Sequence, residues 1–419
     1  MKLKFIAICG SIILLSIVSQ DLFAQRSTQW RGMDRSGFYP SGNLLKEWPK
    51  GGPELLLHVE DLPESYSSVV FYDDMMYTTG IEGENEILTA IDMNGSVRWS
   101  TVYGQAWDKS FSRARTTPTI EGKYAFVISG GGTLACIELE SGSLRWSFEG
   151  LSKFKGKTGT WGTAESPLIV DDKMIYTPCG NNTTMVAVDK LSGETIWKSE
   201  TIGDQSAYCS PVLAGEKGLH LIITVTGNNI ICVNAEDGEI FWKFKYTSVD
   251  APKSGGDINP VTPIVRGREV FVTSGYNHVG ILLEIAEDWR SVSVKWLTRD
   301  LDVHHGGVVY HQGYIYGSNY NTVITGNWVC LDWNTGGLMY ESEEMNKGSV
   351  ILSDGMLICY EERKGNVALV KASPFGFDII SSFRLSHGSG PHWSHPSIYN
   401  NKLFMRHGRS LLVYEIGNP

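Results

Sequence analysis

One short pattern, written five times along the chain, restricts the fold more than any other feature of the sequence. A small residue or cysteine is followed by an apolar residue, an acidic residue or asparagine, a turn ending in glycine, and an aromatic residue four positions later. The copies are AIDMNGSVRW (90–99), CIELESGSLRW (136–146), AVDKLSGETIW (187–197), CVNAEDGEIFW (232–242) and CLDWNTGGLMY (330–340). Because glycine readily adopts the positive φ of a tight turn, each copy predicts a β-hairpin. The turn glycines are Gly95, Gly142, Gly193, Gly238 and Gly336.

A second piece recurs upstream of the hairpins, so that each unit carries four strands. It is an apolar strand opened by proline, a polar turn and another apolar strand, as in VTPIVRGREVFVTSG (261–275). The aromatic residues that end the units recur about every 43–54 residues: Trp99, Trp146, Trp197, Trp242, Trp296, Tyr340 and Phe383. Four-stranded units at this period are typical of β-propeller blades. We predict an all-β, eight-bladed propeller with antiparallel blades. The alternative is seven blades, if the degenerate unit at 348–383 is not a full blade.

The two ends of the repeat region predict how the ring closes. The eighth unit stops after its third strand, and an extra apolar strand precedes the first unit, within GGPELLLHVED (51–61). Pairing residues 54–59 with residues 411–416 would remove both unpaired edges, which are costly in a sheet protein. We therefore expect a ring closed by an N-terminal strand, within a single propeller domain over residues 51–419.

The N-terminus has the layout of a secretory signal peptide over residues 1–24. Lys2 and Lys4 precede an apolar run, and Leu22-Phe23-Ala24 offers a cleavage site. An uncleaved anchor is the alternative, although the run is short for a bilayer span. We expect export to the periplasm or the medium, with no transmembrane span after cleavage. Residues 25–50 then form an arm, whose Trp30, Arg31, Arg35 and Phe38 favour docking on one face of the ring over a mobile arm.

Composition excludes one class of partner. The formal net charge is −10 and no basic run occurs, whereas nucleic-acid binding needs clustered Lys and Arg. The cysteines beyond the signal region are widely spaced, so we expect buried free thiols. They are Cys136, Cys179, Cys209, Cys232, Cys330 and Cys359.

The repeat A-x-D-x-x-x-G-x-x-x-W resembles that of the PQQ-binding-like β-propeller repeat family. Ala187, Asp189, Gly193 and Trp197 match it best. The family includes quinoprotein alcohol dehydrogenases and non-catalytic relatives such as the propeller lipoprotein of outer-membrane β-barrel assembly, which binds protein. The resemblance implies that the repeated aromatics pack between blades, as structural residues.

The resemblance also implies PQQ with Ca²⁺ as a candidate cofactor, but the sequence departs from the catalytic members. No adjacent cysteine pair is present. Glu165 and Asn259 fall where calcium ligands of the family would lie, and no third ligand is convincing. The sequence therefore assigns no cofactor.

Candidate site residues lie in two sets of loops that a propeller presents on one face: those leading into the innermost strands and those joining the second and third strands. Such loops usually carry function. The ligand-binding candidates are Arg115, Trp161, Glu165, Tyr208, Asn259, His278, His304, His305, Lys347, His392, His395 and His407. The other interpretation is that they satisfy backbone groups around the channel. No pair of histidines has a spacing that forces convergence, so we predict no metal site.

Three functions remain open. The leading prediction is a scaffold, expected to be monomeric, that binds a protein partner or a small polar or carbohydrate ligand through the loop face. The alternative is a PQQ-dependent alcohol or sugar dehydrogenase with an external electron acceptor. A hydrolase or lyase that uses the histidine-rich face is third, and catalytic residues are not assigned.

Overall fold

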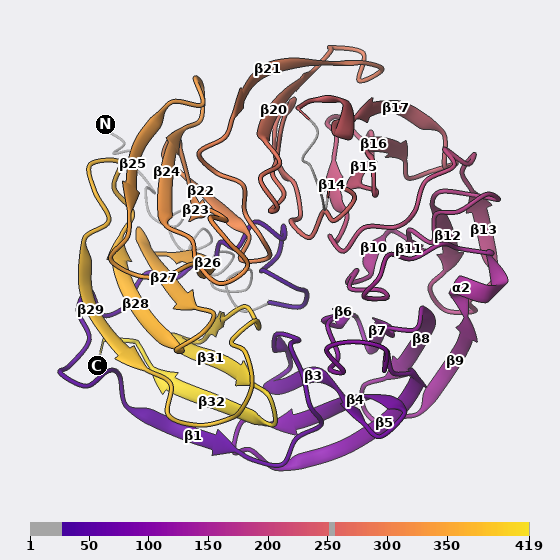
Figure 1. Ribbon diagram of the computed structural model, residues 1–419. Coiled ribbons are helices and arrows are strands. Elements are labelled where there is room, and N and C mark those ends of the chain that lie inside the picture. The colour runs from indigo at the N-terminus through magenta and orange to yellow at the C-terminus, as the bar shows by residue number, and fades with distance from the viewer. Residues whose placement is uncertain (1–26, 251–255, 419) are drawn as a thin grey trace, which may run out of the picture.

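The computed structural model describes residues 27–250 and 256–418, and its strands form a closed ring of eight blades (Figure 1). Each blade is a four-stranded antiparallel sheet. The predicted eight-bladed propeller is therefore confirmed, and the seven-bladed alternative is wrong. The predicted signal peptide at 1–24 lies outside the described residues. Within the described part, no helix has the length and apolar character needed to cross a membrane.

The first four blades follow the chain in order, each running outward from the centre. Blade 1 is β2 (Val70–Tyr72), β3 (Met75–Glu82), β4 (Asn85–Asp92) and β5 (Val97–Gln105). Blade 2 is β6 (Thr119–Glu121), β7 (Tyr124–Ile128), β8 (Thr133–Glu138) and β9 (Leu144–Glu149), followed by the short helix α2 (Gly150–Lys153). Blade 3 is β10 (Leu168–Val170), β11 (Lys173–Tyr176), β12 (Val186–Asp189) and β13 (Thr195–Lys198). Blade 4 is β14 (Val212–Ala214), β15 (Leu221–Val225), β16 (Asn229–Asn234) and β17 (Ile240–Lys245), followed by the turn η1 (Tyr246–Ser248).

The remaining blades continue the ring, and the last one takes its outer strand from the other end of the chain. Blade 5 is β18 (Ile264–Arg266), β19 (Glu269–Val272), β20 (Gly280–Ile285) and β21 (Val292–Thr298). Blade 6 is β22 (Val308–His311), β23 (Tyr314–Ser318), β24 (Trp328–Asp332) and β25 (Leu338–Ser342). Blade 7 is β26 (Gly348–Ser353), β27 (Met356–Glu361), β28 (Asn366–Lys371) and β29 (Ile379–Arg384). Blade 8 is β30 (Ser397–Tyr399), β31 (Lys402–His407), β32 (Ser410–Glu415) and β1 (Leu55–Val59).

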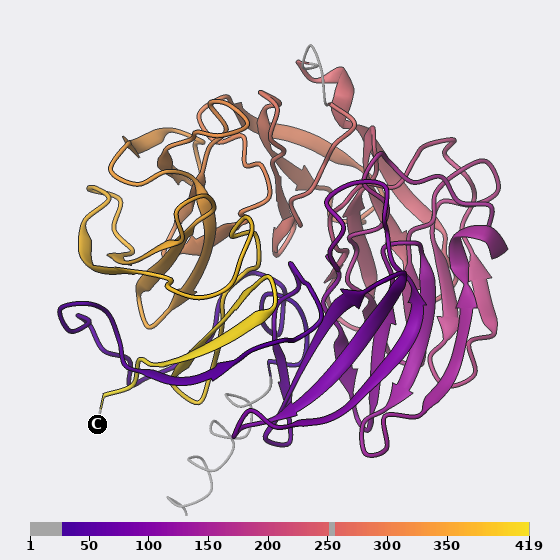
Figure 2. The ribbon, with the colours of Figure 1, turned by 60° about the horizontal axis from the view of Figure 1, so that its bottom comes forward.

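Ring closure has the predicted form. Strand β1 pairs antiparallel with β32, with His58 opposite Leu412 and Val59 opposite Leu411. Figure 2 shows this N-terminal strand running beside the C-terminal strands at the junction between the first and last blades. The pairing covers the edge of β32, and β1 becomes the outer edge strand of blade 8.

The repeated pattern now has a physical explanation. Its small first residue lies directly opposite the aromatic residue across the hairpin, as Ala187 lies opposite Trp197 and Cys232 opposite Trp242. A β-bulge follows this pair in both hairpins. A small side chain leaves room for the indole ring, and a bulge increases the local twist of the strand. The six cysteines within residues 27–250 and 256–418 are buried free thiols.

The repeated tryptophans join neighbouring blades at the rim. The Trp99 indole Nε1 donates to the Leu139 carbonyl of the next blade at 2.9 Å, and a Cβ on Gly142 of that blade would lie 2.6 Å from the same ring. Trp146, Trp197 and Trp296 repeat this arrangement over Gly193, Gly238 and Gly336. We call this contact the rim lock. Each turn glycine is therefore required twice, for its positive φ and for its missing side chain.

Blade 5 breaks the rim lock. Its hairpin turn lacks the glycine and instead carries Trp289 with φ of 61°, buried in the same core cluster as Trp242. In the other rim locks, the carbonyl three residues before the turn glycine accepts the hydrogen bond of the indole. In blade 5, the equivalent carbonyl, that of Ala286, accepts a hydrogen bond from the Trp289 amide at 3.0 Å. The Trp242 Nε1 is consequently buried without a hydrogen-bond partner.

The arm docks at the centre of the ring, where the indigo segment of Figure 1 lies. The Arg31 guanidinium donates to the Val308 carbonyl at 2.5 Å and to the Val350 carbonyl at 3.1 Å, in blades 6 and 7. Arg35 reaches the opposite side, donating to the Ser166 and Pro211 carbonyls of blades 3 and 4, both at 3.0 Å. Both arginines are 2% exposed. The arm therefore ties together blades that are far apart around the ring.

Candidate functional site

A cavity of about 730 Å³ opens at the mouth of the central channel, on the predicted loop face. Its walls come from loops leading into the innermost strands and from loops between second and third strands. Trp30 of the arm contributes to its lining. Six of the predicted site residues line it: Arg115, Trp161, Tyr208, His304, His305 and His395. We call this cavity the face pocket.

Aromatic side chains form much of the wall of the face pocket. Trp393 lies at the centre of one cluster, with ring centroids 4.9 Å from Tyr66, 5.3 Å from Phe111 and 5.2 Å from His305. On another side, the Trp161 and Tyr208 rings lie 5.6 Å apart. Edge-on and tilted aromatic pairs at these separations present rigid apolar surface at little entropic cost.

Arg115 provides a polar anchor in this apolar wall. Its Nη2 donates to the backbone carbonyls of Ser110 at 2.7 Å and Phe111 at 2.9 Å. Its Nη1 is buried and has no partner in the described structure. Burial lowers the pKa of Arg115, and the Glu86 carboxyl opposes that shift. An arginine stays charged in such surroundings, so Arg115 places a positive charge in the pocket wall.

A second polar group consists of Lys347, Glu362 and His305. The Lys347 ammonium lies 3.4 Å from Glu362 Oε1, and His305 Nε2 lies 3.6 Å from Glu362 Oε2. Burial raises the pKa of Glu362 to about 7, against the lowering effect of Lys347. Burial, followed by the charge of Lys347, lowers the pKa of His305 to about 3. Near neutral pH, His305 is neutral and Glu362 exchanges a proton, so it can donate or accept a hydrogen bond.

The arm fixes the pocket floor through His395. Arg31 Nη1 donates to His395 Nδ1 at 2.9 Å, so the ring proton resides on Nε2, which faces the His305 carbonyl at 2.9 Å. Burial, followed by the charge of Arg31, holds the pKa of His395 well below its usual range. The Trp30 and His395 rings meet edge to face at 5.1 Å. His395 thus links arm and loop as a neutral ring.

The other predicted residues lie outside the face pocket or behind its wall. Glu165 accepts hydrogen bonds from the Thr177 amide and hydroxyl at 3.1 and 3.2 Å, and burial raises its pKa to about 8. Asn259 Nδ2 donates to the carbonyls of residues 226 and 227. His278 is buried against the Tyr246 ring. His392 and His407 stack at 3.8 Å behind the loop of residues 387–391. Lys347 does not line the pocket, but its ammonium contacts Glu362 and the Thr322 carbonyl.

These positions test the cofactor that the family resemblance implies. Both oxygens of Glu165 are used by Thr177, and neither Glu165 nor Asn259 lines the face pocket. Glu165 and Asn259 therefore do not fit a calcium–quinone site. Among residues 27–250 and 256–418, two groups of side chains each bring three metal-ligating atoms within 4.8 Å of one another: His304, His305 and Glu362, and His58, Glu60 and His387. In the first group, the Lys347 ammonium already neutralises the carboxylate.

The residues of the face pocket that were not predicted from the sequence include several apolar ones. Tyr66, Phe111, Val323 and Ile324 line the face pocket, and the last three are more than half exposed. Val323 and Ile324 interrupt an otherwise polar loop, SNYNTVITGN (318–327). Two adjacent aliphatic residues in a loop do not belong to the core between the strands. This pair could therefore have indicated an exposed apolar site from the sequence.

Comparisons with known proteins agree with this architecture. The structure superimposes on BamB from Moraxella catarrhalis with a TM-score of 0.62, at 16% identity, over 87% of this chain and 99% of the other. It also superimposes on a quinohemoprotein alcohol dehydrogenase from Comamonas testosteroni with a TM-score of 0.67, at 11% identity, over 97% of this chain and 83% of the other. At these identities, the two likenesses concern the fold alone.

Similarity in sequence points to BamB. The outer membrane protein assembly factor BamB of Moranella endobia (strain PCIT) is 24% identical over 208 residues, 48% of this chain and 47% of that protein. The match thus spans about half the length of this relative. The family model described as outer membrane protein assembly factor BamB matches residues 84–339. The chain therefore belongs to this BamB family of PQQ-repeat propellers.

Proposed function

We propose that this protein is an exported, monomeric scaffold that binds a protein partner in outer-membrane protein assembly through the face pocket. The observation that carries the proposal is an open aromatic pocket with exposed apolar residues at its rim. Val323 is 64% exposed, Phe111 54% and Ile324 53%. Exposed apolar clusters rimmed by polar groups mark interaction sites, and aromatic and arginine side chains dominate the binding energy of interfaces.

The chemistry of the pocket describes the partner. An apolar or aromatic side chain would fill the space lined by Trp393 and Trp161, and the positive charge of Arg115 would favour a carboxylate on the partner. The names of the matched relatives support a role in outer-membrane protein assembly. The apolar N-terminal segment supports export. A dehydrogenase is not proposed, because the calcium-ligand candidates lie outside the pocket.

Site-specific photo-crosslinking in the native organism tests the proposal. A photoreactive residue at Val323 should crosslink to one discrete partner. The matched control is Phe375, which is 92% exposed and lies in the turn between β28 and β29, at the other end of its blade. The Val323 product should disappear when Arg115→Ala is combined with Phe111→Ser. A product at Phe375 and none at Val323 would sink the proposal.

A biochemical assay separates the scaffold from the oxidoreductase. The purified protein is mixed with PQQ and Ca²⁺, and dye reduction is followed with alcohols and sugars. We expect neither stoichiometric quinone binding nor turnover. Turnover that survives Phe111→Ser but fails in Glu165→Gln would instead establish the dehydrogenase.

A further inference from the structure

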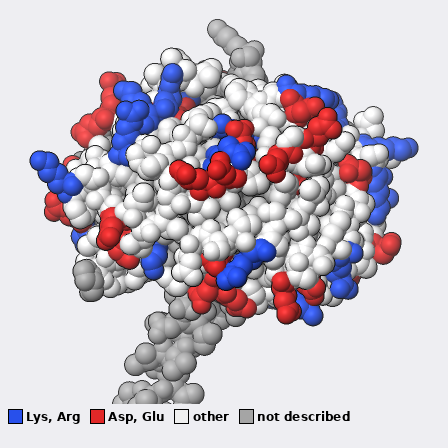
Figure 3. Space-filling view, turned by 90° about the horizontal axis from the view of Figure 1, so that it is seen from below, with Lys and Arg blue, Asp and Glu red and all other residues white. Residues whose placement is uncertain are grey.

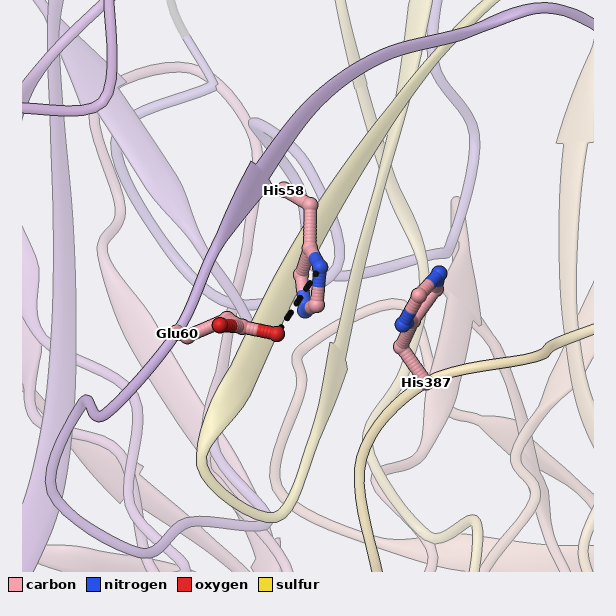
Figure 4. A group of neighbouring side chains, drawn as sticks. All are labelled: His58, Glu60 and His387. Carbon is pink, nitrogen blue, oxygen red and sulfur yellow. Dashed lines mark ion pairs between the residues drawn. The ribbon is translucent and has the colours of Figure 1, made fainter.

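Two histidines and a glutamate meet where the ring closes, away from the face pocket. His58 lies on β1, Glu60 follows that strand, and His387 lies in the loop between β29 and β30. Figure 4 shows the three side chains turned toward one another. One ligating atom from each lies within 4.8 Å of the others. We call these residues the clasp triad.

The distances within the clasp triad suit a transition-metal ion. His58 Nδ1 lies 3.4 Å from Glu60 Oε1, and the two imidazole centroids are 4.2 Å apart. Zinc binds histidine nitrogen and carboxylate oxygen at about 2.0–2.2 Å in tetrahedral geometry, so neighbouring ligand atoms lie roughly 3.4 Å apart. Two imidazoles and one carboxylate form a known zinc ligand set, with water in the fourth position. The Glu60 side chain is 69% exposed, which gives an ion a path from solvent.

The surroundings hold two of the ligands in place. His58 Nε2 lies 3.0 Å from Ser410 Oγ, so the hydroxyl can accept a hydrogen bond from Nε2–H in the tautomer that leaves Nδ1 free to coordinate. Such outer contacts orient metal-binding histidines. The His407 Nδ1 hydrogen bonds to the His387 carbonyl at 2.7 Å and fixes the loop at that residue. In the described chain, no hydrogen bond engages the His387 ring nitrogens.

Charge distinguishes the clasp triad from the cluster in the face pocket. Beside His304, His305 and Glu362, the Lys347 ammonium takes the position of a counter-ion. Among the described residues, no Lys or Arg side chain forms an ion pair with Glu60, whose ion-pair partner is His58. The clasp triad therefore offers a carboxylate that no competing cation neutralises.

We propose that the clasp triad is a zinc site that ties the closing strand β1 to the loop leading into blade 8. The ion would join the two ends of the propeller by bonds that the β1–β32 ladder does not supply. Since the ligands come together only in the closed ring, binding would favour the folded state.

Zinc titration of the chelator-treated, purified protein tests the site. Calorimetry with Zn²⁺ should give one bound ion per chain. His387→Ala and Glu60→Gln should each weaken binding at least about tenfold. At zinc a hundredfold above its Kd, the melting temperature should rise by about 3 °C. This rise should vanish in His387→Ala, whose substitution lies in a loop and leaves the sheet intact.

Two control variants make the result specific. His220→Ala removes an exposed histidine that pairs with Asp171 at 3.1 Å on the rim, and it should bind zinc as the wild type does. His304→Ala disables the cluster in the face pocket and should also retain zinc. The proposal is overturned if the wild type binds no zinc at micromolar protein, if His387→Ala binds normally, or if His304→Ala abolishes binding.

Discussion

Neighbouring blades are joined in two different ways at the rim and at the centre of the ring. At the rim, the same indole–carbonyl–glycine contact recurs between successive blades, as Trp99 on Gly142 illustrates. At the centre, one unrepeated arm places Arg31 and Arg35 among carbonyls of four different blades. The rim contacts are local and replaceable one by one, whereas the arm couples distant blades through two side chains.

The largest expected effect is at the centre. Arg31→Ala leaves the Val308 and Val350 carbonyls without their donor, and it unmakes the bond to His395. We expect a loss of about 3–5 kcal/mol in the free energy of unfolding, because buried acceptors are costly when unpaired. Urea unfolding followed by fluorescence measures it. A loss below that of the rim variants would contradict the contrast between centre and rim.

At the rim, a single methyl group should break a lock. The Cβ of Gly238→Ala would lie 2.5 Å from the Trp197 ring, at a φ of 80°. We expect a loss of about 2–3 kcal/mol from the clash and the strained backbone. Gly122→Ala is the control, since its φ is 58° and nothing lies within 4 Å. Chemical denaturation should show at most about 1 kcal/mol for the control.

The centre should also carry a pH dependence in the neutral range. Burial raises the pKa of Glu165 to about 8 in the folded protein, above its unfolded value, so the folded state binds the proton more tightly. Its contribution to stability is present below the unfolded pKa and is lost as pH rises toward 8. When the pH is raised from 6 to 7, the free energy of unfolding of Glu165→Gln should fall by about 1 kcal/mol less than that of the wild type. Denaturation at each pH measures this, and parallel curves would refute it.

The smallest effect compares two rim tryptophans of similar burial. Trp197 Nε1 donates to the Ala235 carbonyl at 3.0 Å, whereas Trp242 Nε1 is buried without a partner. Trp197→Phe should therefore cost about 1 kcal/mol more than Trp242→Phe, the value of one hydrogen bond. Thermal unfolding of both variants decides this, and equal losses would show that the indole bond contributes nothing.

The fold could be predicted from the sequence because it is written repeatedly, whereas the site could not be predicted in full. The hairpin pattern and the unpaired strand before the first unit determined both the blades and the closure by β1. The site draws on unrepeated loop residues, such as Phe111 and Trp393, which no pattern marks. Arg115 and His305 were found because loop position narrows the choice. Glu165 sits at such a position too, but its side chain turns inward to Thr177.

Surface charge did not contribute to the site prediction. Figure 3 shows basic and acidic side chains interspersed on the side of the ring in view. Although the net charge is −10, the acidic side chains do not form a continuous patch on this side of the ring. The charge therefore does not indicate a class of partner. The proposed recognition rests instead on the aromatic and apolar lining of the face pocket.

The docked arm implies an order of events during synthesis. Ribosomes make residues 27–39 early, yet Arg31 bonds to Val350, and the Tyr39 amide to the Leu352 carbonyl, in the seventh blade. These partners do not exist until most of the chain has been made. Residues 27–39 can therefore take their places only after the blades that follow them in the chain have been made.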